Sequence, residues 1–129
     1  MAVARNAIRR PILGSTAFLL CDIQERFRPL ISNFPHVVAT ADKMVKASRI
    51  LGVPLIVTEQ HPKALGATVA ELDVSHAAMT LPKTKFSMWT PEVETLIVTN
   101  LKTKSAFLFG IESHVCVVTP SNFPTIPSV

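Results

Sequence analysis

Cys116 has the most reactive side chain in this sequence. A thiolate is a strong nucleophile, and a nearby cation or helix N-terminus favours its formation. Cys116 follows an apolar run, residues 105–111, through the segment Glu112-Ser-His-Val. Cysteines placed in this way are also found as inert buried residues, so nucleophilic catalysis requires a base within reach. Cys21 lies inside another apolar run, where a structural thiol is expected.

Asp22 is a candidate for that base, because it follows the apolar residues 16–21 directly. A buried carboxylate is costly unless it is paired or functional, so Asp22 either caps a helix or acts as a general base. Lys83 and Lys85 follow a third apolar stretch. An ammonium group there could stabilise the charges of Asp22 and Cys116 and a developing oxyanion. Lys85 is more typical of a solvated surface lysine.

The histidines do not form a pattern that would bind a metal ion. No two of His61, His76 and His114 have the i, i+4 spacing of a metal-binding helix. We therefore expect neither a metal nor another cofactor. His114 precedes Cys116 by two residues and is an alternative partner for the thiol, although Asp22 is preferred.

Composition is that of a globular domain: 48% of the 129 residues are hydrophobic. The chain has 13 basic and 9 acidic residues, and the basic residues are scattered along the sequence instead of forming a cluster. Because tyrosine is also absent, we predict no nucleic-acid partner. The apolar run at residues 16–21 is too short to span a membrane. We expect a cytoplasmic protein. A mitochondrial location is the alternative, because Arg5, Arg9 and Arg10 precede the first acid.

The order of apolar runs predicts an α/β fold. Strands are expected at residues 16–23, 54–60, 77–81 and 105–111, and a helical turn at 69–72. Apolar spacing predicts a helix over residues 37–51 that ends at Gly52, and Thr90-Pro91 predicts the start of another helix. Alternating strands and helices favour a three-layer open parallel sheet, in which ligands bind beyond the carboxyl ends of the strands.

The domain organisation follows from the same pattern. We expect an N-terminal extension at residues 1–13, a partial domain at 14–118 and a divergent proline-rich tail at 119–129. Three prolines occur in the last ten residues, and a helix cannot continue through them. The sequence therefore predicts an incomplete fold that lacks the C-terminal strands and helices.

Three separated motifs occur along the chain: Leu-Leu-Cys-Asp22-Ile-Gln24, Pro-Lys83-Thr-Lys-Phe86-Ser-Met and Gly110-Ile-Glu-Ser-His-Val-Cys116-Val. Together they resemble the isochorismatase-like cysteine hydrolases. The segment Thr58-Glu-Gln60, followed by His-Pro, makes the resemblance greatest to the animal isochorismatase domain-containing proteins. The resemblance covers residues 14–118. It implies a Rossmann-like sheet, no cofactor and a homo-oligomer with a small-molecule substrate.

The resemblance also implies roles for individual residues. Asp22, Lys83 and Cys116 become base, charge stabiliser and nucleophile, and the backbone N–H groups of Val115 and Cys116 become the oxyanion hole, beside a cis peptide. A substrate pocket is expected from three further residues: Gln24, Phe27 and Phe86. The metal-binding Asp-x-His of nicotinamidases is missing, and isochorismatases proper lack the cysteine. Hydrolysis of a small amide or related carbonyl compound is therefore expected.

A non-catalytic product is the alternative function. An incomplete domain would leave the strand at residues 105–111 as an exposed apolar edge. Such a truncated or alternatively spliced form would act, if at all, by pairing with another protein chain.

Overall fold

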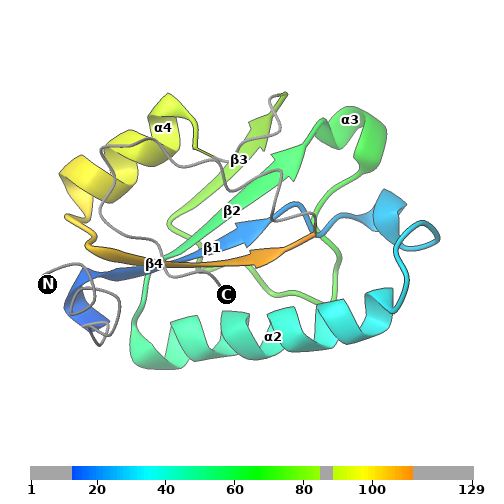
Figure 1. Ribbon diagram of the computed structural model, residues 1–129, viewed down its shortest axis with the longest axis horizontal. Helices are drawn as coiled ribbons and strands as arrows, with labels where there is room; N and C mark the ends of the chain where they lie inside the picture. The colour runs from blue at the N-terminus through cyan, green and yellow to red at the C-terminus, as the bar shows by residue number, and fades with distance from the viewer. Residues whose placement is uncertain (1–12, 85–88, 112–129) are drawn as a thin grey trace, which may run out of the picture.

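The computed structural model describes residues 13–84 and 89–111, which form three layers around a parallel sheet (Figure 1). Helices cover both faces of the sheet. The strands are β1 (Thr16–Cys21), β2 (Leu55–Gln60), β3 (Met79–Lys83) and β4 (Ser105–Gly110). The helices are α2 (Phe34–Leu51), α3 (Pro62–Leu65) and α4 (Pro91–Glu94), with the π-type segment η3 (Thr95–Asn100) and 3-10 turns η1 (Leu13–Ser15) and η2 (Glu25–Phe27).

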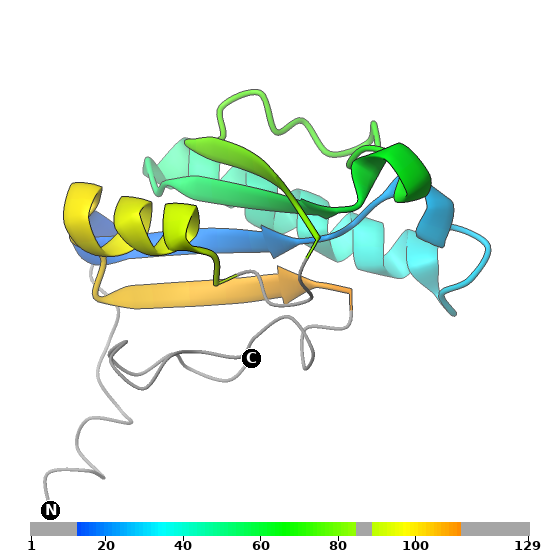
Figure 2. The same ribbon diagram turned by 90° about the horizontal axis from the view of Figure 1, so that it is seen from above.

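The sheet is parallel throughout and has the strand order β3-β2-β1-β4, which Figure 2 shows from above. Every residue of β1 is buried. Because side chains alternate along a strand, Phe18 and Leu20 enter the core against α2, whereas Ala17 and Leu19 enter the core on the opposite face. The predicted open parallel sheet with helices on both faces is confirmed.

Helix α2 packs its apolar stripe against β1 and β4. Phe34, Val38, Ala41 and Val45 are buried at helical spacing. Full burial of a valine or phenylalanine side chain contributes about 1.5–3 kcal/mol. Gly52 ends the helix in the left-handed conformation, and its N–H donates to the carbonyl of Ser48. The helix begins three residues earlier than its apolar spacing alone predicts.

Helix α4 and η3 cover the other face. The Thr90 hydroxyl accepts a hydrogen bond from the Val93 N–H, so Thr90 caps the helix as its sequence predicts. Val93 and Ile97 are fully buried in the core of this face. The helix then continues as the π-type segment η3, in which the N–H of Leu101 donates to the carbonyl of Leu96 five residues earlier.

The segment between β2 and β3 differs from expectation. Residues 62–65 form α3, which the sequence does not predict, and residues 69–72 form only a turn, closed by the Leu72 N–H and the Val69 carbonyl. Strand β3 covers residues 79–83 instead of 77–81, because pairing with β2 sets its limits and places Lys83 opposite Gln60. Pro82 is tolerated because β3 is an outer strand.

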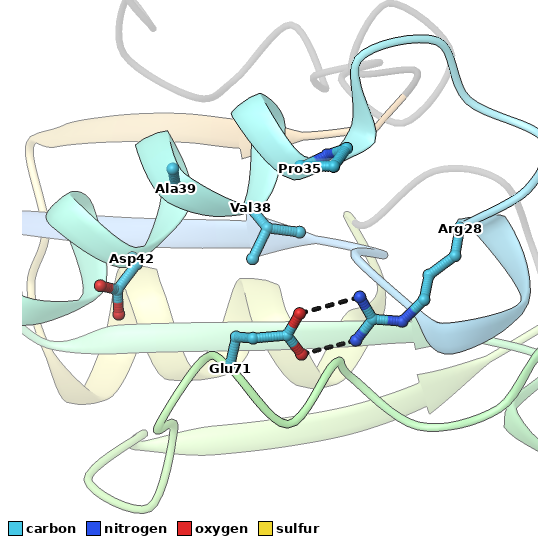
Figure 3. Close-up of a pocket in the computed structure, with 6 residues that line it drawn as sticks. All are labelled: Arg28, Pro35, Val38, Ala39, Asp42 and Glu71. Atoms are coloured by element: carbon cyan, nitrogen blue, oxygen red, sulfur yellow. Dashed lines mark hydrogen bonds and ion pairs between the residues drawn. The ribbon is translucent and has the colours of Figure 1, made fainter.

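A concavity of about 330 Å³ lies beside the N-terminal half of α2 (Figure 3). Arg28 lines this concavity, and its guanidinium group donates hydrogen bonds to the carboxylates of Glu25 and Glu71. The Arg28 hydrogen bond is the main cause that lowers the pKa of Glu71 to about 2 and also lowers the pKa of Glu25. This cluster ties η2 to the loop before β3.

We expect the contribution of this cluster to stability to vanish in acid. Both carboxyl pKa values are depressed in the folded state, so the contribution is complete above about pH 4.5 and is lost as pH falls towards about 2. Arg28→Gln should therefore lower the melting temperature by a few degrees at pH 7 and by less at pH 3. Thermal unfolding at both pH values measures this, with Lys43→Gln as an exposed-cation control. An equal loss at both values would contradict the expectation.

Candidate active site

Polar side chains gather where the strands end. In a parallel sheet all carboxyl ends lie at one edge, here the edge beside α3 (Figure 1). The last residue of β1, Cys21, is opposite Thr58, and Asp22 follows it directly. On the neighbouring strand pair, Gln60 is opposite Lys83. Chain winding reverses between β1 and β4, and open α/β sheets bind ligands at such a reversal.

Asp22 and Lys83 form a buried ion pair at this edge. The Lys83 Nζ lies 2.8 Å from Asp22 Oδ2, and only 2% of the lysine side chain and 6% of the aspartate side chain are exposed. The Thr58 hydroxyl donates to Asp22 Oδ1 over 2.9 Å, and the Cys21 Sγ lies 3.6 Å from Oδ2. Charges at this depth require such partners, because burial removes their hydration.

Side chains alternate between the two faces of a strand, and this alternation explains why the Thr58, Gln60 and Lys83 side chains meet. Ile56 belongs to the core under α4, so Thr58 and Gln60 share its sheet face. Met79 and Leu81 pack against the same core, which places Lys83 on this face too.

Asp22 itself breaks the alternation, with its backbone in the left-handed region at φ 55°. Aspartate tolerates this conformation better than most residues, and such strain is found preferentially at functional sites. The turn lets the carboxylate reach Thr58 and Lys83 instead of continuing the strand.

Two buried glutamines complete the arrangement. Gln60 Oε1 accepts from the Lys83 ammonium over 2.7 Å, and Gln60 Nε2 donates to the Thr84 carbonyl. The Gln24 side chain is fully buried, and its amide exchanges two hydrogen bonds with the Gln60 backbone and donates to the Gly66 carbonyl. Both amide hydrogens of Gln24 are thus bound to protein.

The structure brings together some of the expected residues. Asp22 and Lys83 are in contact, whereas Gln24 lies fully buried against backbone and Phe27 packs against the core under α2. Five candidate residues fall outside the described residues: Lys85, Phe86, His114, Val115 and Cys116. The peptide bonds beside Cys116 lie outside them as well.

Two residues of the site were missed by sequence reasoning, Thr58 and Gln60. The sequence signal for them is that β2 begins with three apolar residues and ends with polar residues at positions 58 and 60, two residues apart. Spacing of this kind places both on one face of the sheet.

Strand β4 leads the chain towards Cys116 from beside Asp22. Gly110 is opposite Cys21, and the Ile111 N–H donates to the Cys21 carbonyl over 3.1 Å. Cys116 follows Ile111 by five residues. The end of β4 is therefore hydrogen-bonded to Cys21, the residue before Asp22, only five residues before Cys116 in the sequence.

Within residues 13–84 and 89–111, no group of three or more histidine, cysteine or acidic side chains could hold a metal ion. Over the same residues, no helix has the length and apolar character needed to cross a membrane. His76, one of the histidines considered as a ligand, instead contacts the Ser48 hydroxyl and Arg49.

A sequence model of the isochorismatase domain matches residues 16–120. The chain belongs to the isochorismatase family. It is 46% identical over 106 residues to isochorismatase domain-containing protein 1 of Salmo salar, covering 82% of this chain and 38% of that protein. It is 41% identical over 118 residues to isochorismatase domain-containing protein 2 of Homo sapiens, covering 92% and 57%.

Solved structures of the isochorismatase family share the fold. The chain is similar to the structure of MAR1 ribonuclease from Caenorhabditis elegans, with 42% identity and a TM-score of 0.76, over 84% of this chain and 56% of that one. The chain thus spans only part of the length of these relatives, from 38% to 57%.

Proposed function

We propose that this chain is part of a cysteine hydrolase that acts on a small amide or a related carbonyl compound without a metal ion. The observation that supports it is the buried Asp22–Lys83 ion pair, which lies beside the strand that leads to Cys116. A carboxylate base, a cation and a thiol nucleophile together form a set of groups that can hydrolyse an amide through a covalent intermediate.

In the proposed reaction, Asp22 accepts the thiol proton as the Cys116 sulfur bonds to the substrate carbonyl carbon. Backbone N–H groups of Val115 and Cys116 stabilise the oxyanion. Its collapse breaks the C–N bond, and the amine leaves with the proton from Asp22. Water then attacks the thioester with Asp22 as base, which releases the acid and restores the thiol.

Lys83 stabilises the negative charge of Asp22 in this scheme, and Thr58 fixes the carboxylate. Both contacts lie in a buried setting, where electrostatic interactions are stronger than in water. The carboxylate is thereby held in one place between the two steps.

RNA cleavage is the second candidate, because the 42% identical structure from Caenorhabditis elegans is called a ribonuclease. Phosphodiester cleavage needs cations that face a phosphate. The ammonium of Lys83 is instead engaged with Asp22 and Gln60. The described part of the site therefore favours amide chemistry.

Trapping of the covalent intermediate tests the proposal. The protein is incubated with a panel of primary amides and N-carbamoyl amino acids, quenched in acid, digested and analysed by mass spectrometry. We expect an acyl adduct on the peptide that contains Cys116, accompanied by ammonia release.

Cys116→Ala serves as the control and should give neither adduct nor ammonia. Ammonia release that persists in Cys116→Ala would refute the thiol mechanism. Cleavage of single-stranded RNA by the wild type and Cys116→Ala alike would favour the second candidate.

A further inference from the structure

Lys83 has a second hydrogen-bonding partner that the proposed chemistry does not use. Gln60 Oε1 lies 2.7 Å from the ammonium, slightly closer than Asp22 Oδ2 at 2.8 Å. Gln60 is 7% exposed and Lys83 is 5% exposed, so the contact is made inside the protein. An ammonium can donate three hydrogen bonds, and two of them are fixed by these acceptors.

The surroundings determine which way the Gln60 amide points. Its Nε2 faces the Thr84 carbonyl, which can only accept, and its Oε1 faces the Lys83 ammonium, which can only donate. A reversed amide would lose both hydrogen bonds. Gln60 is therefore locked in one orientation by its two neighbours.

The backbone of Gln60 is fixed as well. Gln24 donates to its carbonyl over 2.9 Å and accepts from its N–H over 2.7 Å, so the Gln24 amide imitates a strand and extends the pairing of β2 past the end of β1. A third hydrogen bond joins Gln24 to the Gly66 carbonyl. Asp22 lies two residues before Gln24, so the same stretch of chain supplies the carboxylate and this support.

We propose that Gln60, held by Gln24, is a positioning residue that directs the Lys83 ammonium towards Asp22. This inference rests on the proposed function for its catalytic meaning. A neutral amide suits the task because it fixes the ammonium without taking up its charge, whereas a carboxylate at this position would compete with Asp22 for the cation.

The ammonium signal of Lys83 tests the positioning directly. In ¹H–¹⁵N spectra recorded on protein labelled with ¹⁵N-lysine, a buried, hydrogen-bonded ammonium exchanges slowly with water. Lys83→Met assigns its signal. We expect Gln60→Met to increase the exchange rate of this signal at least about tenfold, because one of its acceptors is removed.

Reactivity of the thiol tests the catalytic meaning, with iodoacetamide as the probe and peptide mapping to follow Cys116. We expect Gln60→Met to lower the alkylation rate at pH 7 about tenfold. Gln60→Glu keeps the size and the acceptor, so it should retain slow exchange but still lower alkylation. Ser48→Ala, a buried polar change in α2, should alter neither readout.

Each outcome decides the matter. Unchanged ammonium exchange in Gln60→Met, or unchanged alkylation in both Gln60 variants, would overturn the proposal. If instead Cys116→Ala retains ammonia release, the proposed function fails, and the exchange measurement still shows whether Gln60 holds Lys83.

Discussion

Lys83→Met is expected to lower the free energy of unfolding by about 3–5 kcal/mol, the usual cost of removing one partner from a buried ion pair. Methionine fills much of the same space, so the loss comes from Asp22, whose carboxylate would remain almost fully buried without its cation. Urea unfolding followed by circular dichroism measures the change. Lys43→Met, an exposed lysine of α2, should stay within about 0.5 kcal/mol of the wild type.

A double-mutant cycle separates the ion pair from the packing of its two side chains. Asp22→Asn should also destabilise the protein, because it leaves the ammonium of Lys83 buried without its carboxylate. The double variant removes both charges and should cost less than the sum of the single changes. Additive losses would show that the two side chains do not interact.

Activity and stability are expected to separate in this cycle. The double variant regains part of the stability but should remain inactive, since it lacks both the base and the cation of the proposed reaction. Ammonia release from the best amide of the panel measures this. Turnover in the double variant close to that of the wild type would exclude Asp22 and Lys83 from the chemistry.

The layers of the fold could be predicted from local patterns. A continuous apolar run marked β1, because a strand buried on both faces needs no polar positions, and a short β-branched run marked β2. Periodic apolar residues marked α2. The Thr90-Pro91 start of α4 was equally readable, since capping depends on neighbouring residues only. These elements are the ones whose limits local chemistry sets.

Other boundaries depend on contacts between distant segments. Residues 77–78 are as suitable for a strand as residues 82–83, and pairing of Gln60 with Lys83 decides between them. Helix α3 is one turn long and starts at a proline after His61, whose φ of 37° is unfavourable for its side chain. Strain of this kind is imposed by tertiary structure and leaves no periodic signal.

The site shows the same division. A separation of 61 residues between Asp22 and Lys83 gives no local pattern. The residues alone offered both Lys83 and Lys85 as partners of Asp22, and the family resemblance assigned the role to Lys83. Gln24 was expected in a substrate pocket together with the residue roles that the resemblance implies, whereas the structure binds its amide to the Gln60 backbone. Amide hydrogen bonds to a neighbouring strand cannot be inferred without the register of that strand.

Gly110→Ala is the second change with a large expected effect, because a methyl group added at this residue of β4 would meet the backbone of β1. A Cβ built on Gly110 would overlap the Cys21 carbonyl oxygen and lie 2.8 Å from its carbonyl carbon. Its φ of 147° is also unfavourable for any other residue.

The clash joins the added Cβ to backbone atoms of Cys21, so no rotation of a side chain can relieve it. The two strands must therefore separate beside Asp22. We expect a loss of about 3 kcal/mol or more in unfolding free energy, together with faster exchange of the Lys83 ammonium. Gly14→Ala is the matched control, since nothing lies within 4 Å of its added methyl group. Equal stability of the two variants would mean that β1 and β4 are not packed as closely as the structure shows. A stable Gly110→Ala protein with altered ammonium exchange would show instead that this glycine serves the geometry of the site more than the fold.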